Sequence, residues 1–152
     1  SRVLSRLNDQ FHASSIEDVF VTLLLASIDL KTRLITFCNA AHCPALAWTA
    51  ADAPVVQATR ESNYPIGVVP GHVFEEETFQ IQAGGGFWLY TDGVIEAMDD
   101  QQRLFGVERL KSLLERKKAS DTALRDLLTS IQEFTGGAPQ SDDLTAVSIN
   151  AL

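Results

Sequence analysis

The chain has 152 residues, 45% of them apolar and 21% charged, a composition typical of one folded globular domain and unlike that of a disordered segment. Its net charge is −8, which disfavours binding to nucleic acid, because such binding depends on basic residues that neutralise phosphates. The longest apolar run, within Val19–Ile28, is well short of the roughly 20 residues of a membrane-spanning helix.

No leader peptide opens the chain, and its two cysteines are too few for a disulfide framework. We therefore expect a cytoplasmic protein that binds neither membrane nor nucleic acid.

The first third of the chain predicts a helix and a hairpin. Apolar residues at helical spacing predict an amphipathic helix over residues 2–12, followed by a polar break at Ser14-Ser15. No capping segment precedes this helix, so we expect part of the domain to lie upstream. Val19–Ile28 is dense in aliphatic side chains and predicts a central strand covered on both faces. Asp29–Thr32 predicts a turn and Arg33–Cys38 a returning strand.

The middle of the chain is rich in short strand patterns. Pro65–Gly71 is predicted to be a loop, because it has proline near each end and glycine for tight bends. The strand over Val73–Ile81 has an acidic face and is expected at an edge. The predicted strands are Pro44–Trp48, Val55–Thr59, Val73–Ile81 and Phe87–Thr91.

Two helices and a strand are predicted for the last third. One helix runs from Val107 to the basic Arg116–Lys118. The other runs from Leu124 to Phe134, and Ser120 and Asp121 offer caps at its start. It is expected to stop at Gly136-Gly137, and a half-buried strand follows within Leu144–Leu152.

Antiparallel strands joined by short turns argue against a Rossmann arrangement, which interleaves helices with strands. The pattern favours the α+β class and a layered sandwich.

Two acidic turns are the main candidates for a functional site. Asp92-Gly93 follows a wholly apolar run, so packing fixes its carboxylate at the mouth of a buried strand. Asp142-Asp143 opens the last strand, and alternation along that strand directs only one of the two toward a shared site. Carboxylates on a fixed frame suit Mg²⁺ or Mn²⁺. The alternative is that both are ordinary solvated turns.

The segment Asn39–Pro44 is a third candidate. Cys38, His42 and Cys43 could suggest zinc, but their spacing matches no common zinc site. His42 is either a general acid or base, or a turn histidine hydrogen-bonded to nearby backbone. The acidic runs Glu75–Glu77 and Asp99-Asp100 are interpreted as solvated faces rather than as surfaces for a basic partner.

Other reaction classes find no support. The chain has no G-x-S-x-G elbow, no P-loop and no G-x-G-x-x-G that opens a helix. Gly84–Gly86 precedes a strand, so it lacks the helix N-terminus that phosphate cradles use.

Six segments together resemble the SpoIIE/RsbU branch of the bacterial metal-dependent protein phosphatases, the PPM or type 2C superfamily. The resemblance covers nearly the whole chain. In order, the segments are Phe20–Leu24, Asn39–Pro44, Pro65–Val68, Tyr90–Ala97, Phe105–Leu110 and Asp142–Thr145.

The resemblance implies a layered α-β-β-α sandwich of two stacked antiparallel sheets flanked by helices. It also implies hydrolysis of phosphoserine or phosphothreonine with two Mn²⁺ or Mg²⁺ ions. It implies that Asp92 and Asp142 are metal ligands and that Asp143 is a supporting residue. It further implies a phosphorylated STAS-type anti-sigma-factor antagonist as substrate and an upstream receiver, PAS or GAF sensor domain.

The chain also departs from the family pattern. The family's upstream Gly-Asp motif, whose Asp bridges both metals, and a following Gly-Asp-Val-x-Gly-like segment are absent from these residues. Residues 1–152 are therefore interpreted as the C-terminal portion of a phosphatase domain, with the N-terminal part missing and little or no activity alone. The family's Asn-Ala-Gly-His motif has alanine in place of glycine at Ala41. The alternative hypothesis is a catalytically inactive, phosphatase-like module that binds a regulatory protein.

Overall fold

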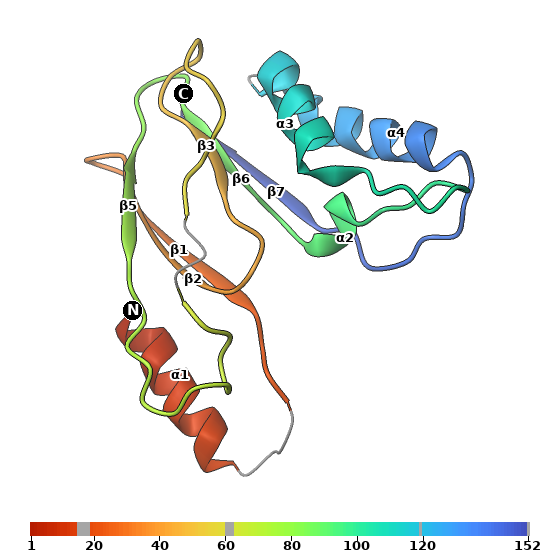
Figure 1. Ribbon diagram of the computed structural model, residues 1–152. Coiled ribbons are helices and arrows are strands. Elements are labelled where there is room, and N and C mark those ends of the chain that lie inside the picture. The colour runs from red at the N-terminus through yellow and green to blue at the C-terminus, as the bar shows by residue number, and fades with distance from the viewer. Residues whose placement is uncertain (15–18, 60–62, 119, 152) are drawn as a thin grey trace. The chain divides into compact units, whose positions relative to one another are not determined.

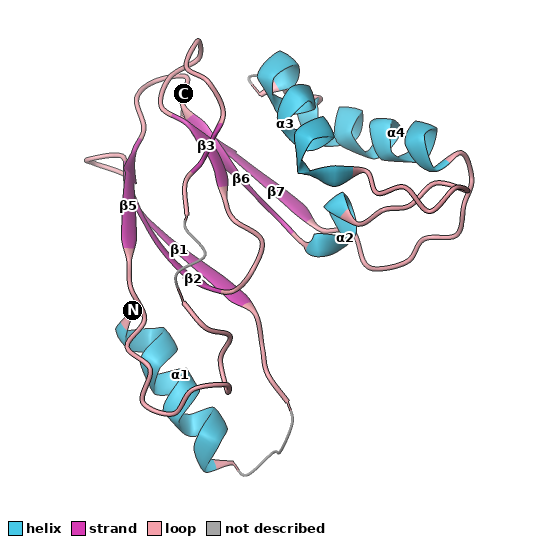
Figure 2. Ribbon diagram, viewed as in Figure 1, coloured by secondary structure: helices cyan, strands magenta, loops and turns pink. Residues whose placement is uncertain are grey.

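The computed structural model describes residues 1–14, 19–59, 63–118 and 120–151 (Figure 1). The chain divides into two compact units, the first formed by Ser1–Pro44 with Gln57–Gln80 and the second by Ala45–Val56 with Ile81–Leu152. Helices and strands occur in both (Figure 2). Two residues of the predicted elements, Ser15 and Leu152, lie outside the described residues.

The first unit contains one helix and a three-stranded antiparallel sheet in the order β1-β2-β5. The predicted hairpin is confirmed, because β1 and β2 pair from Leu23 opposite Ala40 onward. The turn is closed by Asp29 Oδ1, which accepts the N–H groups of Lys31 and Thr32 at 2.8 and 3.2 Å. The elements are α1 (Arg2–Ala13), β1 (Leu23–Asp29), β2 (Leu34–Ala40) and β5 (Glu77–Gln80).

The prediction that Val19–Ile28 is a central strand covered on both faces is wrong. β1 begins at Leu23 and lies at the end of the strand order, so within the described residues only β2 pairs along it. Leu25 is 39% exposed. A run of aliphatic residues indicates an apolar segment, but it does not reveal which neighbours cover the segment.

The strand predicted over Val73–Ile81 forms only at Glu77–Gln80, and its edge position is confirmed. The residues before it bond to a side chain instead of a strand. Asn63 Oδ1 accepts the Glu75 N–H at 2.8 Å, and Asn63 Nδ2 donates to the Glu75 carbonyl at 3.2 Å.

Helix α1 contributes to the apolar core of the first unit through Leu4, which is fully buried. Its one buried polar residue, Asn8, ties the helix to the following loop. Asn8 Nδ2 donates to the Val69 carbonyl at 2.8 Å, and its Oδ1 accepts the Gly67 N–H at 2.9 Å. The core cluster comprises Leu4, Cys38, Ala40, Ile66 and Phe74, with Phe11 and Leu23 packed against it.

The second unit holds most of a four-stranded sheet with the order β4-β3-β6-β7. β6 is central in this order, and Phe87, Trp88 and Tyr90 are buried, as predicted for this strand. The strands are β3 (Leu46–Trp48), β4 (Val56–Gln57), β6 (Gly86–Tyr90) and β7 (Ala146–Asn150). The helices are α2 (Asp92–Ile95), α3 (Gly106–Lys117) and α4 (Ala123–Thr135).

The two long helices of this unit are confirmed. α4 ends at Gly136, which has φ +60° and forms a left-handed C-cap. The predicted caps at Ser120 and Asp121 are wrong, because the N-cap residue is Thr122. Its hydroxyl donates to Asp126 Oδ2 at 2.9 Å, one turn into the helix.

The last turn of α3 is tied to the segment between β3 and β4. Lys118 is 6% exposed, and its Nζ donates to the Ala53 carbonyl and, at 3.2 Å, to Glu115 Oε2. Glu115 Oε1 accepts the Val55 N–H, and this hydrogen bond is the main reason that the pKa of Glu115 is lowered. The helix end and the distant segment therefore share one hydrogen-bond network.

The observed architecture confirms the predicted fold class. The chain is α+β, with two antiparallel sheets flanked by helices.

Candidate functional site

Asp92 stands where the buried strand β6 gives way to helix α2. The strand ends at Tyr90, Thr91 is the N-cap residue, and Asp92 is the first residue of the helix. The Asp92 side chain is exposed, and its Oδ1 accepts the Gly93 N–H at 3.0 Å. Packing of β6 thus fixes the backbone from which an accessible carboxylate projects.

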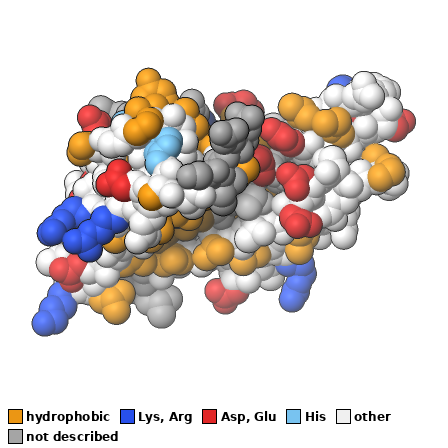
Figure 3. Space-filling view, turned by 90° about the horizontal axis from the view of Figure 1, so that it is seen from below, with side chains coloured by type: hydrophobic (Ala, Val, Ile, Leu, Met, Phe, Trp, Pro, Cys, Tyr) orange, Lys and Arg blue, Asp and Glu red, His pale blue; other side chains and the backbone are white. Residues whose placement is uncertain are grey.

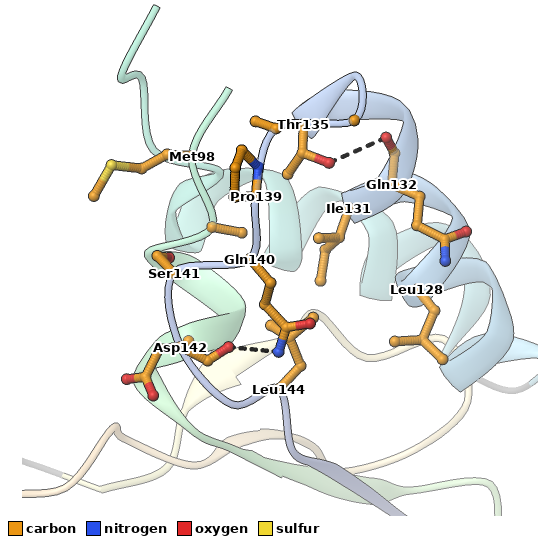
Figure 4. A pocket seen from close by; sticks show the side chains of 14 residues that line it. Met98, Leu128, Ile131, Gln132, Thr135, Pro139, Gln140, Ser141, Asp142 and Leu144 are labelled. Carbon is orange, nitrogen blue, oxygen red and sulfur yellow. Dashed lines mark hydrogen bonds between the residues drawn. The ribbon is translucent and has the colours of Figure 1, made fainter. Parts of the chain in front are cut away.

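Asp142 lies in the turn that precedes β7. Its Oδ1 accepts the Asp143 N–H at 2.7 Å. Gln140 Nε2 donates to the Asp142 carbonyl at 2.7 Å, so a side chain of the same loop holds the Asp142 backbone (Figure 4).

Hydrogen bonds join the two acidic turns directly. The Thr91 N–H donates to the Thr145 carbonyl, the Thr91 hydroxyl donates to the Asp143 carbonyl, and the Thr145 N–H donates to the Thr91 hydroxyl, each at 3.0 Å. The antiparallel register of β6 and β7, with Tyr90 opposite Ala146, produces this contact. The turns are therefore neighbours, although 52 residues separate Thr91 from Asp143 in the chain.

Close packing at Gly93 reinforces the contact. A Cβ atom at this position would lie 2.5 Å from the Asp143 carbonyl oxygen. The glycine is thus needed for space, because any side chain would push the two turns apart.

The donor chemistry of the turns fits a hard divalent cation. Asp92 and Asp142 offer carboxylate oxygens, and neither forms an ion pair in the described part of the chain. The donor number is small, however, since the described residues contain no group of three or more His, Cys, Asp and Glu side chains able to hold a metal ion. These turns therefore fit part of a metal site.

A pocket of about 260 Å³ adjoins the Asp142 turn in the same unit. Met98, Leu128 and Ile131 contribute apolar side chains to its lining, and Gln132 and Gln140 contribute amides. The Asp142 carboxylate points away from Leu128 and Ile131 (Figure 4). The pocket is thus a neighbour of the acidic turns and is not centred on their carboxylates.

The Asn39–His42 loop of the first unit is organised by a buried asparagine. Asn39 Nδ2 donates to the His42 carbonyl at 2.9 Å, and Asn39 Oδ1 accepts the His42 N–H at 2.8 Å. His42 Nδ1 lies 3.4 Å from the Thr22 hydroxyl. Ala41, which lies between Asn39 and His42 in the chain, has φ +55°, a left-handed conformation unusual for a residue with a Cβ. His42 thus lies in a turn, as one of the two interpretations has it, but its ring contacts a side-chain hydroxyl instead of nearby backbone.

The interpretation of Asp99 as part of a solvated face is wrong. Asp99 is 6% exposed, and its carboxylate accepts the backbone N–H groups of Gln101 and Arg103 and the Arg103 Nε–H. Burial alone would raise the pKa of this carboxyl, but the hydrogen bonds from Arg103 and Gln101 outweigh it and lower the pKa. The sequence does hold a signal for this pairing, since Arg103 follows Asp99 by four residues.

The interpretation of Glu75–Glu77 as a solvated face agrees with the structure for Glu75 and Glu76, which are exposed. Acidic side chains occupy several separate places on the face seen in Figure 3.

Thr91 and Thr145 are the residues that the sequence analysis missed. Both belong to the segments quoted for the resemblance, but only the pairing of β6 with β7 reveals that they bond to each other.

The fold and the joined acidic turns are in keeping with the PPM-type phosphatases that the sequence resembles. The model of the family described as stage II sporulation protein E (SpoIIE) matches residues 1–151, and the chain belongs to this family. The resemblance to the SpoIIE/RsbU branch is thereby confirmed.

Individual relatives agree with this assignment. Protein IcfG of Synechocystis sp. is 26% identical over 149 residues, which cover 95% of this chain and 23% of IcfG. The RsbU and RsbW domains of Rv1364c from Mycobacterium tuberculosis match with a TM-score of 0.70 and 23% identity, over 92% of this chain and 38% of that one. The SpoIIE phosphatase domain from Bacillus subtilis, presoaked with Mn, matches with a TM-score of 0.67 and 21% identity. The match covers 99% of this chain and 65% of that domain's chain.

The chain thus spans less than two thirds of each of these relatives. None of the helices in the described ranges has the length and apolarity needed to cross a bilayer.

Proposed function

We propose that this chain contributes Asp92 and Asp142 to the metal site of a phosphoserine or phosphothreonine protein phosphatase. The observation that carries the proposal is the hydrogen-bonded contact between the two acidic turns through Thr91. Membership of the SpoIIE family supports the reaction class.

The metal would be Mn²⁺ or Mg²⁺, because both prefer oxygen donors on a rigid frame. When bound, such ions activate water and balance the charge on phosphoryl oxygens. The chain's own part is to present two carboxylates from turns whose backbones are fixed by β6, β7 and the Gly93 contact.

We further propose that residues 1–152 are the C-terminal portion of the phosphatase domain and that the remaining metal ligands belong to a preceding segment. The 65% coverage of the SpoIIE phosphatase domain supports this division. Residues 1–152 alone should have little or no activity, since two carboxylates hold Mg²⁺ poorly.

The proposed substrate is a phosphorylated STAS-type anti-sigma-factor antagonist in the cytoplasm, and the proposed upstream neighbour is a receiver, PAS or GAF sensor domain. The family resemblance supports both. The similarity to a protein with RsbU and RsbW domains is in keeping with a signalling role.

The test is an assay of the longer protein on a phosphorylated STAS protein with Mn²⁺. Asp92→Asn and Asp142→Asn should each abolish turnover, because each removes a charged ligand. Asp100→Asn, at an exposed acid of the same unit, is the control and should leave turnover unchanged. Turnover that survives Asp92→Asn would refute the assignment.

The second candidate is a catalytically inactive module that binds a regulatory protein. The small donor set of the described residues favours it. It predicts that the longer protein neither hydrolyses phosphoserine nor binds Mn²⁺, yet still captures a partner. A preceding Gly-Asp motif in that protein would favour the enzyme.

A further inference from the structure

We propose that Thr91 is a positioning residue for metal binding: its hydroxyl holds the turns of Asp92 and Asp142 at the spacing that a shared cation requires. This inference rests on the proposed function, since it concerns the same two carboxylates. It means that a side chain that is not itself a metal ligand influences how tightly the site binds the metal.

The hydroxyl of Thr91 acts both as a hydrogen-bond donor and as an acceptor. It donates to the Asp143 carbonyl and accepts the Thr145 N–H, each at 3.0 Å. A hydroxyl carries a single donor, so this donor is fully committed to the opposite turn. The Thr91 N–H adds a third bond, to the Thr145 carbonyl at 3.0 Å.

The position of Thr91 makes this use unusual. A threonine at a helix N-cap ordinarily accepts a hydrogen bond from an amide in the first turn of its own helix. Thr91 is the N-cap residue of α2, yet it makes no side-chain cap bond. Its hydroxyl faces the neighbouring turn instead, so the bond contributes to the spacing of the turns rather than to α2.

Thr91 is linked to Asp92 by a peptide bond and to the Asp142 turn by a hydrogen bond at Asp143. Asp92 follows Thr91 directly, and Asp142 directly precedes Asp143, whose carbonyl Thr91 holds. Both carboxylates are exposed and lack a basic partner among the described residues, so their backbones set their positions. Loss of the hydroxyl removes two of the three Thr91 bonds between the turns, while the bond from the Thr91 N–H to the Thr145 carbonyl remains.

Metal affinity should respond more strongly than folding. The sheet pairing of β6 with β7 and the Gly93 contact remain when the hydroxyl is removed. A cation, by contrast, requires donor oxygens within tenths of an ångström of their ideal places. Removal of groups that orient metal ligands typically weakens metal affinity by about 10- to 100-fold.

The experiment compares Thr91→Val with Thr91→Ser in the longer protein, with Mn²⁺ binding followed by calorimetric titration. Valine has the shape of threonine without the hydroxyl, whereas serine keeps the hydroxyl. We expect the dissociation constant for Mn²⁺ to rise about tenfold in Thr91→Val and to stay near the wild-type value in Thr91→Ser. In the phosphatase assay, Thr91→Val should need more Mn²⁺ for half-maximal rate and recover its rate at saturating Mn²⁺.

Thr135→Val is the matched control. The Thr135 hydroxyl donates to the Gln132 carbonyl at 3.2 Å within α4, so the same chemical change occurs in the same unit at a hydroxyl whose hydrogen bond lies outside residues 91–93 and 142–145 of the two turns. Its Mn²⁺ affinity should equal that of the wild type. If Thr91→Val does not fold, Thr91→Cys replaces it, because its thiol bonds weakly and should bind Mn²⁺ several-fold less tightly than Thr91→Ser.

Two results would overturn the inference. One is wild-type Mn²⁺ affinity in Thr91→Val, or in Thr91→Cys if that variant is used, with only a lower melting temperature. The other is equal loss of affinity in Thr91→Ser and Thr91→Val, which would show that the hydroxyl is not responsible. Failure of the wild-type protein to bind Mn²⁺ is a different outcome, since it rejects the proposed metal site itself and the role of Thr91 with it.

Discussion

Gly93 and Ala41 are small residues at two turns, and each turn constrains its residue in a different way. At Gly93 the demand is space, since a Cβ would lie 2.5 Å from the Asp143 carbonyl oxygen, whereas φ is not left-handed. At Ala41 the demand is conformation, because φ is +55° although a Cβ is present. The exposed Ala41 side chain has room. The two small residues therefore answer different physical requirements. An exchange between glycine and alanine should destabilise the protein at Gly93 and stabilise it at Ala41.

The largest effect is expected for Gly93→Ala. The new methyl group must displace the backbone of Asp143, so the free energy of unfolding should fall by about 3 kcal/mol, the upper end for overpacking. Denaturant unfolding measures it. Gly71→Ala is the control, because Gly71 has φ +67° but no atom within 4 Å of the place that a new methyl group would occupy. A smaller cost at Gly93 than at Gly71 would contradict the argument from space.

Asn39→Ala tests how the turn at Ala41 is held. Asn39 is 4% exposed and bonds both the N–H and the carbonyl of His42, so its loss should cost about 1–3 kcal/mol. Asn39→Asp should cost at least as much as Asn39→Ala, because its carboxylate keeps the acceptor for the His42 N–H but sets a second, buried and charged, acceptor against the His42 carbonyl. Equal stability of Asn39→Ala and the wild type in urea would show that the loop holds itself.

Ala41→Gly should stabilise the protein. Removing the strain of a left-handed alanine should raise the free energy of unfolding by about 1–2 kcal/mol. Glycine also makes the unfolded chain more flexible, which offsets about 0.4–1 kcal/mol of this gain. The expected net gain is about 0.5–1 kcal/mol, measured as a higher denaturant midpoint. A loss of stability would mean that the Ala41 conformation is unstrained.

The smallest effect concerns pH and the turn closed by Asp99. Because the pKa of Asp99 is lowered in the folded protein, its contribution to stability is complete above its ordinary unfolded value near 3.9 and is lost as pH falls through the lower folded pKa. The stability difference between the wild type and Asp99→Asn should therefore be constant near neutral pH and shrink below about pH 4. Chemical unfolding at several pH values measures it, and a difference that grows on acidification would reverse the sign.

Local signals predicted much of the fold. The stop of α4 at Gly136 follows from glycine's access to left-handed angles, and the Asp29 turn follows from a side chain that bonds its own backbone. Both features depend on residues close in sequence, so the chain displays them directly.

The features that the sequence did not predict depend on distant partners. The apolar run around Leu25 does not reveal that β1 has a strand on one side only in the described sheet. The Thr91 hydroxyl gains its role only once β6 and β7 pair in register. Asp92 and Asp142 were chosen as ligands by residue type and motif, and their joint role in metal binding stays a prediction.

The buried Lys118 network has a consequence for local opening. Its Nζ joins the end of α3 to Ala53, 65 residues away, and Glu115 holds the amide of Val55. The final turn of α3 therefore cannot fray without exposing that amide to solvent. Amide hydrogen exchange at Val55 and at the last residues of α3 should follow a common protection factor, with both accelerated together in Lys118→Met.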